Sequence, residues 1–156
     1  MNLATLCYLR QNNKTLFLYR DVHKEKDVNF GYHIGIGGKV LENETLDQCI
    51  RREFVEETGL VIHDPILKGL ITFENNNDNE WQVYIYVATS YTGTLRESNE
   101  GKLTWVDNDK ISQLSLSEGD KIFLLHVFQQ GYFHGTIKYK VEEGKRTLLE
   151  HKIEMI

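Results

Sequence analysis

Three glutamates lie close together near the end of one segment of this 156-residue chain: Glu53, Glu56 and Glu57. If that segment is helical, successive residues are about 100° apart around its axis, and an apolar stripe forms from Leu46, Cys49, Ile50 and Phe54. Glu53 and Glu57 then fall in the middle of the apolar stripe, and Glu56 falls at its edge.

Carboxylates on the inner face of a helix are unfavourable unless a partner compensates their charge. Like charges four residues apart repel each other, and partial burial strengthens the repulsion. A simple solvated face therefore does not account for Glu53 and Glu57. Hard carboxylate oxygens suit Mg²⁺ or Mn²⁺ better than zinc, so the spacing predicts a site for one of these two ions.

The element that positions these glutamates is predicted to be a helix from Thr45 to Thr58. Thr45 and Gln48 have the spacing of a capping box at its start. Gly59 follows at the position where glycine commonly ends a helix. Upstream, Ile34–Val40 is predicted to be a strand whose glycines let another group approach its backbone.

The glutamates also belong to a longer pattern from Gly38 to Leu60, which reads GKVLENETLDQCIRREFVEETGL. This segment resembles the Nudix box, in which a glycine, a glutamate and the pattern Arg-Glu-apolar-x-Glu-Glu-x-Gly-apolar recur at fixed spacing. Gly38, Glu44 and Arg52 occupy the expected places, and Phe54 stands where the family usually has an aliphatic residue. The chain is therefore identified as a member of the Nudix hydrolase family.

Segments outside the box resemble one branch of that family. Bacterial MutT-type enzymes, which hydrolyse oxidised purine nucleoside triphosphates such as 8-oxo-dGTP, have segments similar to LATLCYL, YHIGIGGKV, LKGLITF, SNEGKLTWV and SEGDKIF. The C-terminal FHGTIKY is similar to a segment of the vertebrate enzyme of the same activity. The resemblance implies one Nudix domain over residues 1–156, an α/β/α sandwich with a mixed sheet and two main helices.

The resemblance also implies roles for individual residues in binding metal. The expected ligands are the carboxylates of Glu53, Glu56 and Glu57, the backbone carbonyl of Gly37 and the carboxylate of Glu100. Either Glu53 or Glu56 is expected to accept a proton from the attacking water.

Other residues around the box are expected to support the reaction or to bind phosphate. Arg52 is expected to orient a box glutamate through a salt bridge. Glu44 either supports catalysis in this way or is a plain partner of the dipole at the helix N-terminus. Gly38 lets the backbone approach the phosphates, while Arg20 and Lys39 are either phosphate ligands or surface charges.

The candidate residues for recognising the base lie further from the box. Asp120 stands at the start of a second predicted helix, Glu118–Gln130. By resemblance it lies near the purine ring, where a carboxyl group accepts from the purine edge or, when protonated, donates to it. The alternative is a first-turn aspartate favoured by the helix dipole. Ile34 and Phe73 either line the same pocket or belong to the core.

Strands are expected to make up the rest of the domain. The alternation of apolar and polar residues predicts an N-terminal hairpin, a central pair and a C-terminal hairpin. Their ranges are Leu3–Leu9 with Thr15–Tyr19, Ile66–Phe73 with Trp81–Thr89, and Thr136–Val141 with Thr147–Ile153.

Composition limits the partners of the protein. The formal net charge is −5 and the sequence has no basic stripe, so binding of a nucleic-acid polymer is not expected. The sequence has no apolar run long enough to span a membrane, and its N-terminus lacks the features of a signal peptide. Cys7 and Cys49 lack metal-ligand spacing, so we expect buried thiols in a cytoplasmic protein.

The expected function is that of a metal-dependent pyrophosphohydrolase that acts on a small-molecule nucleotide and releases a nucleoside monophosphate and pyrophosphate. Two alternatives stay open. One is the same chemistry on ADP-ribose or a dinucleoside polyphosphate, and the other is a non-catalytic Nudix nucleotide-binding module. Such a module would be expected to lose box glutamates, so the intact Glu53, Glu56 and Glu57 count against it. The sequence carries no signal for the oligomeric state.

Overall fold

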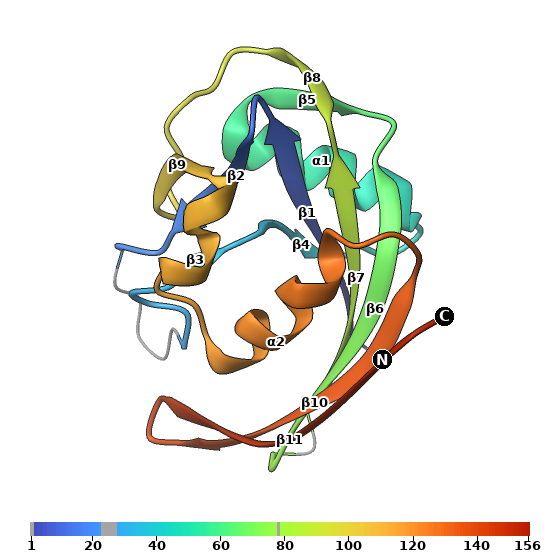
Figure 1. Cartoon of the computed structure of the whole chain (residues 1–156), viewed down its shortest axis with the longest axis vertical. Coiled ribbons are helices and arrows are strands. Elements are labelled where there is room, and N and C mark those ends of the chain that lie inside the picture. Colours follow the sequence, from blue (N-terminus) through green and yellow to red (C-terminus); the bar gives the residue numbers. More distant parts are fainter. Residues whose placement is uncertain (1, 23–27, 78) are drawn as a thin grey trace.

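The computed structural model describes residues 2–22, 28–77 and 79–156, and Figure 1 shows a curled sheet with helices on both of its sides. The strands are β1 (Asn2–Gln11), β2 (Lys14–Tyr19), β3 (His33–Ile34), β4 (Ile36–Lys39), β5 (Leu60–His63), β6 (Ile66–Asn75), β7 (Glu80–Ala88), β8 (Ser90–Gly93), β9 (Lys102–Asp107), β10 (Phe133–Glu142) and β11 (Lys145–Met155). The helices are α1 (Leu46–Thr58), the 3₁₀ helix η1 (Asn108–Gln113) and α2 (Glu118–Val127).

The main sheet is mixed, as the sequence predicts. Its strands follow the order β11-β10-β6-β7-β1-β2-β3, with β4 also paired to β1 and β9 to β2. The pairs β1–β7 and β10–β6 are parallel, whereas the pair β6–β7 and the C-terminal hairpin β10–β11 are antiparallel. The strands β5 and β8 form a separate antiparallel pair.

The helices cover opposite faces of the main sheet. Successive side chains of a strand point to opposite faces, and β1 follows this rule. Cys7 and Leu9 enter a cluster with Ile50 and Phe54 of α1, while Tyr8 enters a cluster with Phe123 of α2. The expectation of an α/β/α sandwich is therefore confirmed.

The ends of α1 agree with the sequence prediction. The Thr45 side chain accepts from the Gln48 backbone N–H at 3.1 Å, and the Gln48 side chain accepts from the Thr45 N–H at 2.9 Å. Gly59 ends the helix with a φ of 79°, in the left-handed region that glycine adopts without steric strain. These two ends fix where along the helix each glutamate stands.

The predicted glycine strand Ile34–Val40 is two strands instead of one. β3 pairs with β2, whereas β4 pairs with β1, and Gly35 lies between them. The predicted N-terminal hairpin is also shorter than expected, because most of β2 pairs with strands other than β1. β1 and β2 pair only at Arg10–Thr15 and Gln11–Lys14, and β2 then pairs with β9 and β3.

The sequence analysis missed the strands β5, β8 and β9. β5 and β8 have four residues each, too few to show a period, and they exist because they pair with each other. The predicted helix Glu118–Gln130 ends earlier, at Val127. Phe128 turns out of the helical path and packs edge-on against Tyr8, with the Arg10 guanidinium 3.5 Å from its ring centre.

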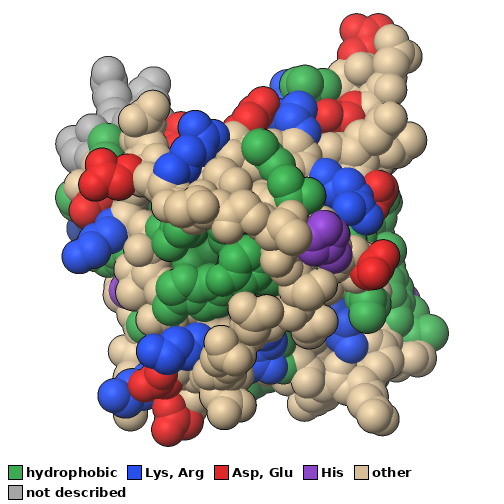
Figure 2. All heavy atoms as spheres, turned by 90° about the horizontal axis from the view of Figure 1, so that it is seen from above, with side chains coloured by type: hydrophobic (Ala, Val, Ile, Leu, Met, Phe, Trp, Pro, Cys, Tyr) green, Lys and Arg blue, Asp and Glu red, His purple; other side chains and the backbone are tan. Residues whose placement is uncertain are grey.

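One face of the molecule shows how charge is distributed over the surface. In Figure 2 hydrophobic side chains gather at the centre of this face, and Lys, Arg, Asp and Glu side chains of both signs lie around them. This mixture agrees with the absence of a basic stripe from the sequence. Among the described residues, no helix is long and apolar enough to cross a membrane.

Candidate active site

The glycines of β4 bring its backbone against two glutamates of α1. The Gly37 N–H donates to Glu57 Oε2 at 3.3 Å. A Cβ on Gly38 would lie 2.5–2.7 Å from the carboxylate atoms of Glu53, so only glycine leaves room for that carboxylate. Glu53 and Glu57 are partly buried and Glu56 is exposed, as the helical positions predict.

Arg52 holds a network of carboxylates beside this contact. Its Nε and Nη2 donate to the two oxygens of Glu44 at 2.6 and 3.0 Å. Its Nη1 donates to Glu53 at 2.9 Å and to Glu56 at 3.1 Å, and Nη2 also donates to the Lys39 carbonyl at 3.1 Å. Such charge-assisted, two-pronged contacts are the strongest hydrogen bonds that arginine forms.

Glu44 is positioned by this network and not by the helix dipole alone. Its pKa is lowered to about 2, first by the hydrogen bond from Arg52 and then by the Leu41 N–H, which donates to it at 3.0 Å. Lys39 contributes to the network through its carbonyl, while its side chain is exposed.

Glu53, Glu56, Glu57 and Glu100 are called the carboxylate cluster from here on. The pKa of Glu57 is raised to about 8, first by burial and then by the negative charges of Glu53 and Glu100, whereas the Gly37 N–H and Arg20 oppose the shift. Burial also raises the pKa of Glu53. Ionisation of the inner carboxyl groups is therefore unfavourable unless a positive charge compensates it.

Glu100 reaches the cluster from the loop between β8 and β9. Ser98 Oγ accepts from the Glu100 N–H at 3.1 Å, and Ser98 and Gly101 form an isolated β-bridge across the turn. The Glu100 carboxylate lies 3.5 Å from Arg20 Nη1. Two residues far apart in sequence, Arg20 and Glu100, are thus brought together as the predicted site requires.

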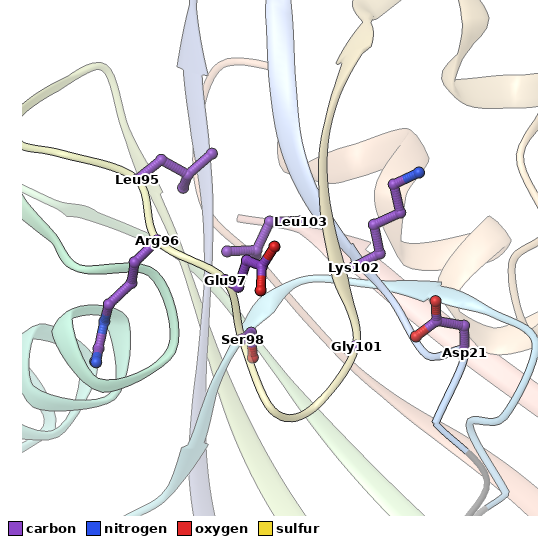
Figure 3. A pocket seen from close by; sticks show the side chains of 8 residues that line it. All are labelled: Asp21, Leu95, Arg96, Glu97, Ser98, Gly101, Lys102 and Leu103. Carbon is purple, nitrogen blue, oxygen red and sulfur yellow. The ribbon is translucent and has the colours of Figure 1, made fainter.

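The same loop borders a pocket of about 470 Å³, shown in Figure 3. In that view Arg96 points toward α1, and Glu97 and Ser98 lie between it and Lys102. Arg96 Nη2 donates to the Val55 carbonyl at 2.9 Å and also to the Glu56 carbonyl. The sequence analysis missed Arg96, although a cation is favourable at a helix C-terminus, where carbonyls lack partners.

The donor atoms of the cluster suit a hard divalent cation. They are carboxylate oxygens, and Glu53, Glu57 and Glu100 are partly buried. The raised pKa of Glu57, caused first by burial, reflects a cost of ionisation that a cation would offset. Within the described residues, no three His, Cys, Asp or Glu side chains already converge as a ligand set. Two of the four cluster carboxylates, those of Glu53 and Glu56, are instead held by Arg52.

A second pocket, of about 660 Å³, lies on the α2 side of the sheet and is called the Asp120 pocket. It contains two of the residues predicted to bind the base, Phe73 and Asp120. The Phe73 ring is parallel to the Tyr139 ring, at an interplanar angle of 5° and a centroid distance of 6.4 Å. The sequence analysis missed other residues that line the pocket, among them Asn29, Trp81, Tyr139, Val141 and Arg146.

Asp120 both starts α2 and lines the pocket, and its contact with a base stays a prediction. Its backbone N–H donates to Ser117 Oγ at 3.3 Å in the first turn of α2, and its carboxyl group lines the pocket. Burial raises the pKa of this carboxyl to about 6, while Arg146 and Ser117 lower it.

Ile34 is not among the residues that line the Asp120 pocket, so its role in binding the base stays a prediction. Its side chain packs against the hydrophobic core between α1 and the sheet, because β3 pairs with β2 at Leu18 and turns the Ile34 side chain to that face.

Tyr8 packs against the glycine-containing segment from the α2 side of the sheet. Its ring packs on Gly35, where a Cβ would lie 2.9 Å from the ring, and Gly35 is two residues before Gly37. The charge of Asp120 acts on Tyr8 and contributes to the raised pKa of its hydroxyl, although burial is the larger cause.

A box helix with inward carboxylates, a glycine strand against them and a pocket on the other face of the sheet define a hydrolase of the Nudix type. The NUDIX domain family matches residues 2–127, so the chain belongs to the Nudix family. It is a Nudix pyrophosphohydrolase, and enzymes of this family generally use divalent metal ions.

Individual relatives agree with this assignment. The chain is 36% identical to the uncharacterized Nudix hydrolase YvcI of Bacillus subtilis over 145 residues, 89% of this chain and 87% of the relative. It is 33% identical to the oxidized purine nucleoside triphosphate hydrolase of Danio rerio over 134 residues, 85% of this chain and 84% of the relative. The crystal structure of the mutator MutT protein from Bacillus halodurans matches with a TM-score of 0.86 at 26% identity, over 99% of this chain and 98% of that chain.

Proposed function

We propose that this single-domain enzyme hydrolyses oxidised purine nucleoside triphosphates to a nucleoside monophosphate and pyrophosphate. The observation that carries the proposal is the pairing of the carboxylate cluster with a pocket that contains an aromatic face and the Asp120 carboxyl group. The similarity to the oxidized purine nucleoside triphosphate hydrolase of Danio rerio supports the choice of substrate. A small-molecule nucleotide, and not a nucleic-acid polymer, is the proposed partner.

Mg²⁺ or Mn²⁺ is the proposed cofactor, held by Glu53, Glu56, Glu57, Glu100 and the Gly37 carbonyl. When bound, such an ion supplies neutralisation of phosphate charge and lowers the pKa of a water molecule. The inner position of Glu57 against the Gly37 N–H favours it as a fixed ligand.

The residues around the cluster orient the reaction. Glu53 or Glu56 accepts the proton of the attacking water, and Arg52 holds both carboxylates so that they point to one side of α1. Glu44 acts as a positioning residue, because it fixes the Arg52 guanidinium through two hydrogen bonds. The backbone of Gly38 and the side chains of Arg20 and Lys39 are proposed to contact phosphate oxygens, and Phe73 and Asp120 the base.

A substrate panel in Mg²⁺ tests this proposal. kcat/KM is measured for 8-oxo-dGTP, dGTP, ADP-ribose and a dinucleoside tetraphosphate, and the products are identified by chromatography. The highest kcat/KM is expected for 8-oxo-dGTP, with its monophosphate and pyrophosphate as products. A higher value for ADP-ribose or the dinucleoside compound would replace this substrate class by another, and an absence of hydrolysis with every divalent ion would remove the function.

A further inference from the structure

Arg146 brings a cation into the Asp120 pocket from outside the region that defines the family. It stands at the start of β11, opposite Val141 of β10, whereas the family match ends at residue 127. Among the described residues that line the pocket, Arg146 is the only lysine or arginine. The pocket therefore contains a donor-only group, Arg146, together with the carboxyl group of Asp120.

The Arg146 side chain is held in place by three contacts. Its guanidinium lies over the Tyr139 ring at 5.0 Å from the ring centre. Its Nη2 donates to Asn29 Oδ1 at 3.0 Å and to the Val28 carbonyl at 3.4 Å. Within the described structure the N–H groups of Nε and Nη1 make no hydrogen bond, so they stay available to an occupant of the pocket.

The surface beneath the guanidinium is itself rigid. The Tyr139 hydroxyl accepts from the Gly119 N–H at 2.6 Å, which joins β10 to the first turn of α2 beside Asp120. Asn76 donates to the Val141 carbonyl and accepts from the Val141 N–H, which joins the hairpin to the loop after β6. A side chain held between such anchors loses little conformational entropy when it binds a ligand.

We propose that Arg146 is a specificity-determining residue that donates a hydrogen bond to a ring carbonyl oxygen of the base, so that the Asp120 pocket prefers 6-oxopurines to 6-aminopurines. This inference rests on the proposed function, because it assumes that a purine occupies the pocket. Arginine can donate to the O6 carbonyl oxygen of guanine and of 8-oxoguanine, whereas adenine presents an amino donor in place of O6. An arginine that faces the adenine amino group would place two donors against each other.

Binding of product monophosphates tests the inference without catalysis. Dissociation constants for dGMP, 8-oxo-dGMP and dAMP are measured by calorimetry with the wild type, Arg146→Gln and Arg146→Lys. Arg146→Gln is expected to weaken dGMP and 8-oxo-dGMP by about ten- to a hundredfold and dAMP by less than about threefold. Arg146→Lys keeps the charge but loses the planar fork, so it should recover only part of the preference.

Lys145→Gln is the matched control, since Lys145 is the exposed neighbour of Arg146 on the same hairpin. It should leave all three dissociation constants unchanged. Equal weakening of the three monophosphates by Arg146→Gln would mean that Arg146 only supports the fold, and unchanged constants would also overturn the inference.

The two proposals fail in different ways. If the wild type binds dGMP through Arg146 but hydrolyses no purine nucleoside triphosphate, the inference stands and the proposed function falls. If the wild type hydrolyses 8-oxo-dGTP and Arg146→Gln keeps the wild-type ratio of dGMP to dAMP affinity, the inference falls and the proposed function stands.

Discussion

Most residues of the carboxylate cluster are close together in the sequence, whereas the residues of the Asp120 pocket are far apart in it. Glu53, Glu56 and Glu57 lie within one turn and a half of α1, and the glycines that face them come shortly before that helix. The Asp120 pocket takes its lining from β6, β7, β10, β11, the start of α2 and the segment before β3. Apart from Glu100, the carboxylate cluster is thus encoded locally, whereas the Asp120 pocket depends on the pairing of distant strands.

Because of this difference, substitutions in the two regions are expected to change different kinetic constants. The three glutamates of α1, held against the glycines of one strand, keep their geometry whatever the sheet edge does. A pocket whose wall is the C-terminal hairpin changes with a few residues of that hairpin, which Figure 1 shows curling beneath α2. Changes in the carboxylate cluster should therefore alter kcat for every substrate, and changes in the Asp120 pocket should alter KM for some of them.

Glu57→Gln is expected to have the largest effect. The substitution removes the charge of an inner carboxylate but keeps an oxygen that can accept from the Gly37 N–H. kcat in Mg²⁺ should fall by about 10²- to 10³-fold, with the ratio of activities on different nucleotides unchanged. Glu42→Gln is the control, because Glu42 is exposed in the loop before α1. A wild-type rate for Glu57→Gln would disprove its place in the metal site.

Arg52→Lys is expected to have the next largest effect. Lysine keeps the positive charge but cannot hold Glu44 with two hydrogen bonds while it reaches Glu53 and Glu56. We expect kcat to fall by about ten- to a hundredfold and Tm to fall as well. Arg51→Lys, one residue earlier on α1, should retain most activity. Equal losses in the two variants would show that the network around Arg52 has no special role.

Asp120→Asn should change KM and leave kcat near its wild-type value. If Asp120 contacts the purine edge, KM for 8-oxo-dGTP should rise by about ten- to a hundredfold, while KM for a pyrimidine triphosphate stays nearly constant. Glu118→Gln is the control for the helix-dipole interpretation, since Glu118 is exposed in the same first turn. A similar change of KM in both variants would leave Asp120 as a helix-start residue.

The two regions also differ in how much of each was predictable from the sequence. The bounds of α1 and the inner positions of Glu53 and Glu57 follow from capping signals and the helical period, which are local properties. Glu100 was found only through the family resemblance, and its contact with Arg20 was not predicted, because no local pattern relates residues 80 positions apart.

Residues of the Asp120 pocket were harder to predict for a physical reason. Tyr139 reaches Phe73 because β10 pairs in parallel with β6, and Arg146 follows because the hairpin pairs it with Val141. Strand register between distant segments is set by the whole sheet and leaves no mark at a single position. The sequence left open whether Ile34 lines the pocket or belongs to the core for the same reason, since the face of its side chain depends on which strand β3 joins.

The smallest expected effect is on stability in metal-free buffer. The pH range over which a buried carboxyl group changes the stability of the fold should differ between the two regions. Both regions hold a carboxyl whose pKa is higher in the folded protein, at about 8 for Glu57 and about 6 for Asp120, than its ordinary values of 4.5 and 3.8. As pH rises, the unfolded chain releases each proton first. The folded state then binds more protons, so its stability falls with rising pH.

The stability that each protonated carboxyl contributes to the folded state is fully present below the pKa of that group in the unfolded chain. It is lost as the pH rises through the pKa of the group in the folded protein. The Tm of Asp120→Asn minus that of the wild type should therefore rise between about pH 4 and 6 and stay constant at higher pH. The Tm of Glu57→Gln should keep gaining up to about pH 8, with both gains on the order of a few degrees. Saturating Mg²⁺ should cancel the gain of Glu57→Gln, because the ion stabilises the ionised carboxylate, and should leave that of Asp120→Asn. If both variants gained Tm over the same pH range, or if Mg²⁺ changed both Tm gains equally, the two carboxyl groups would share one environment.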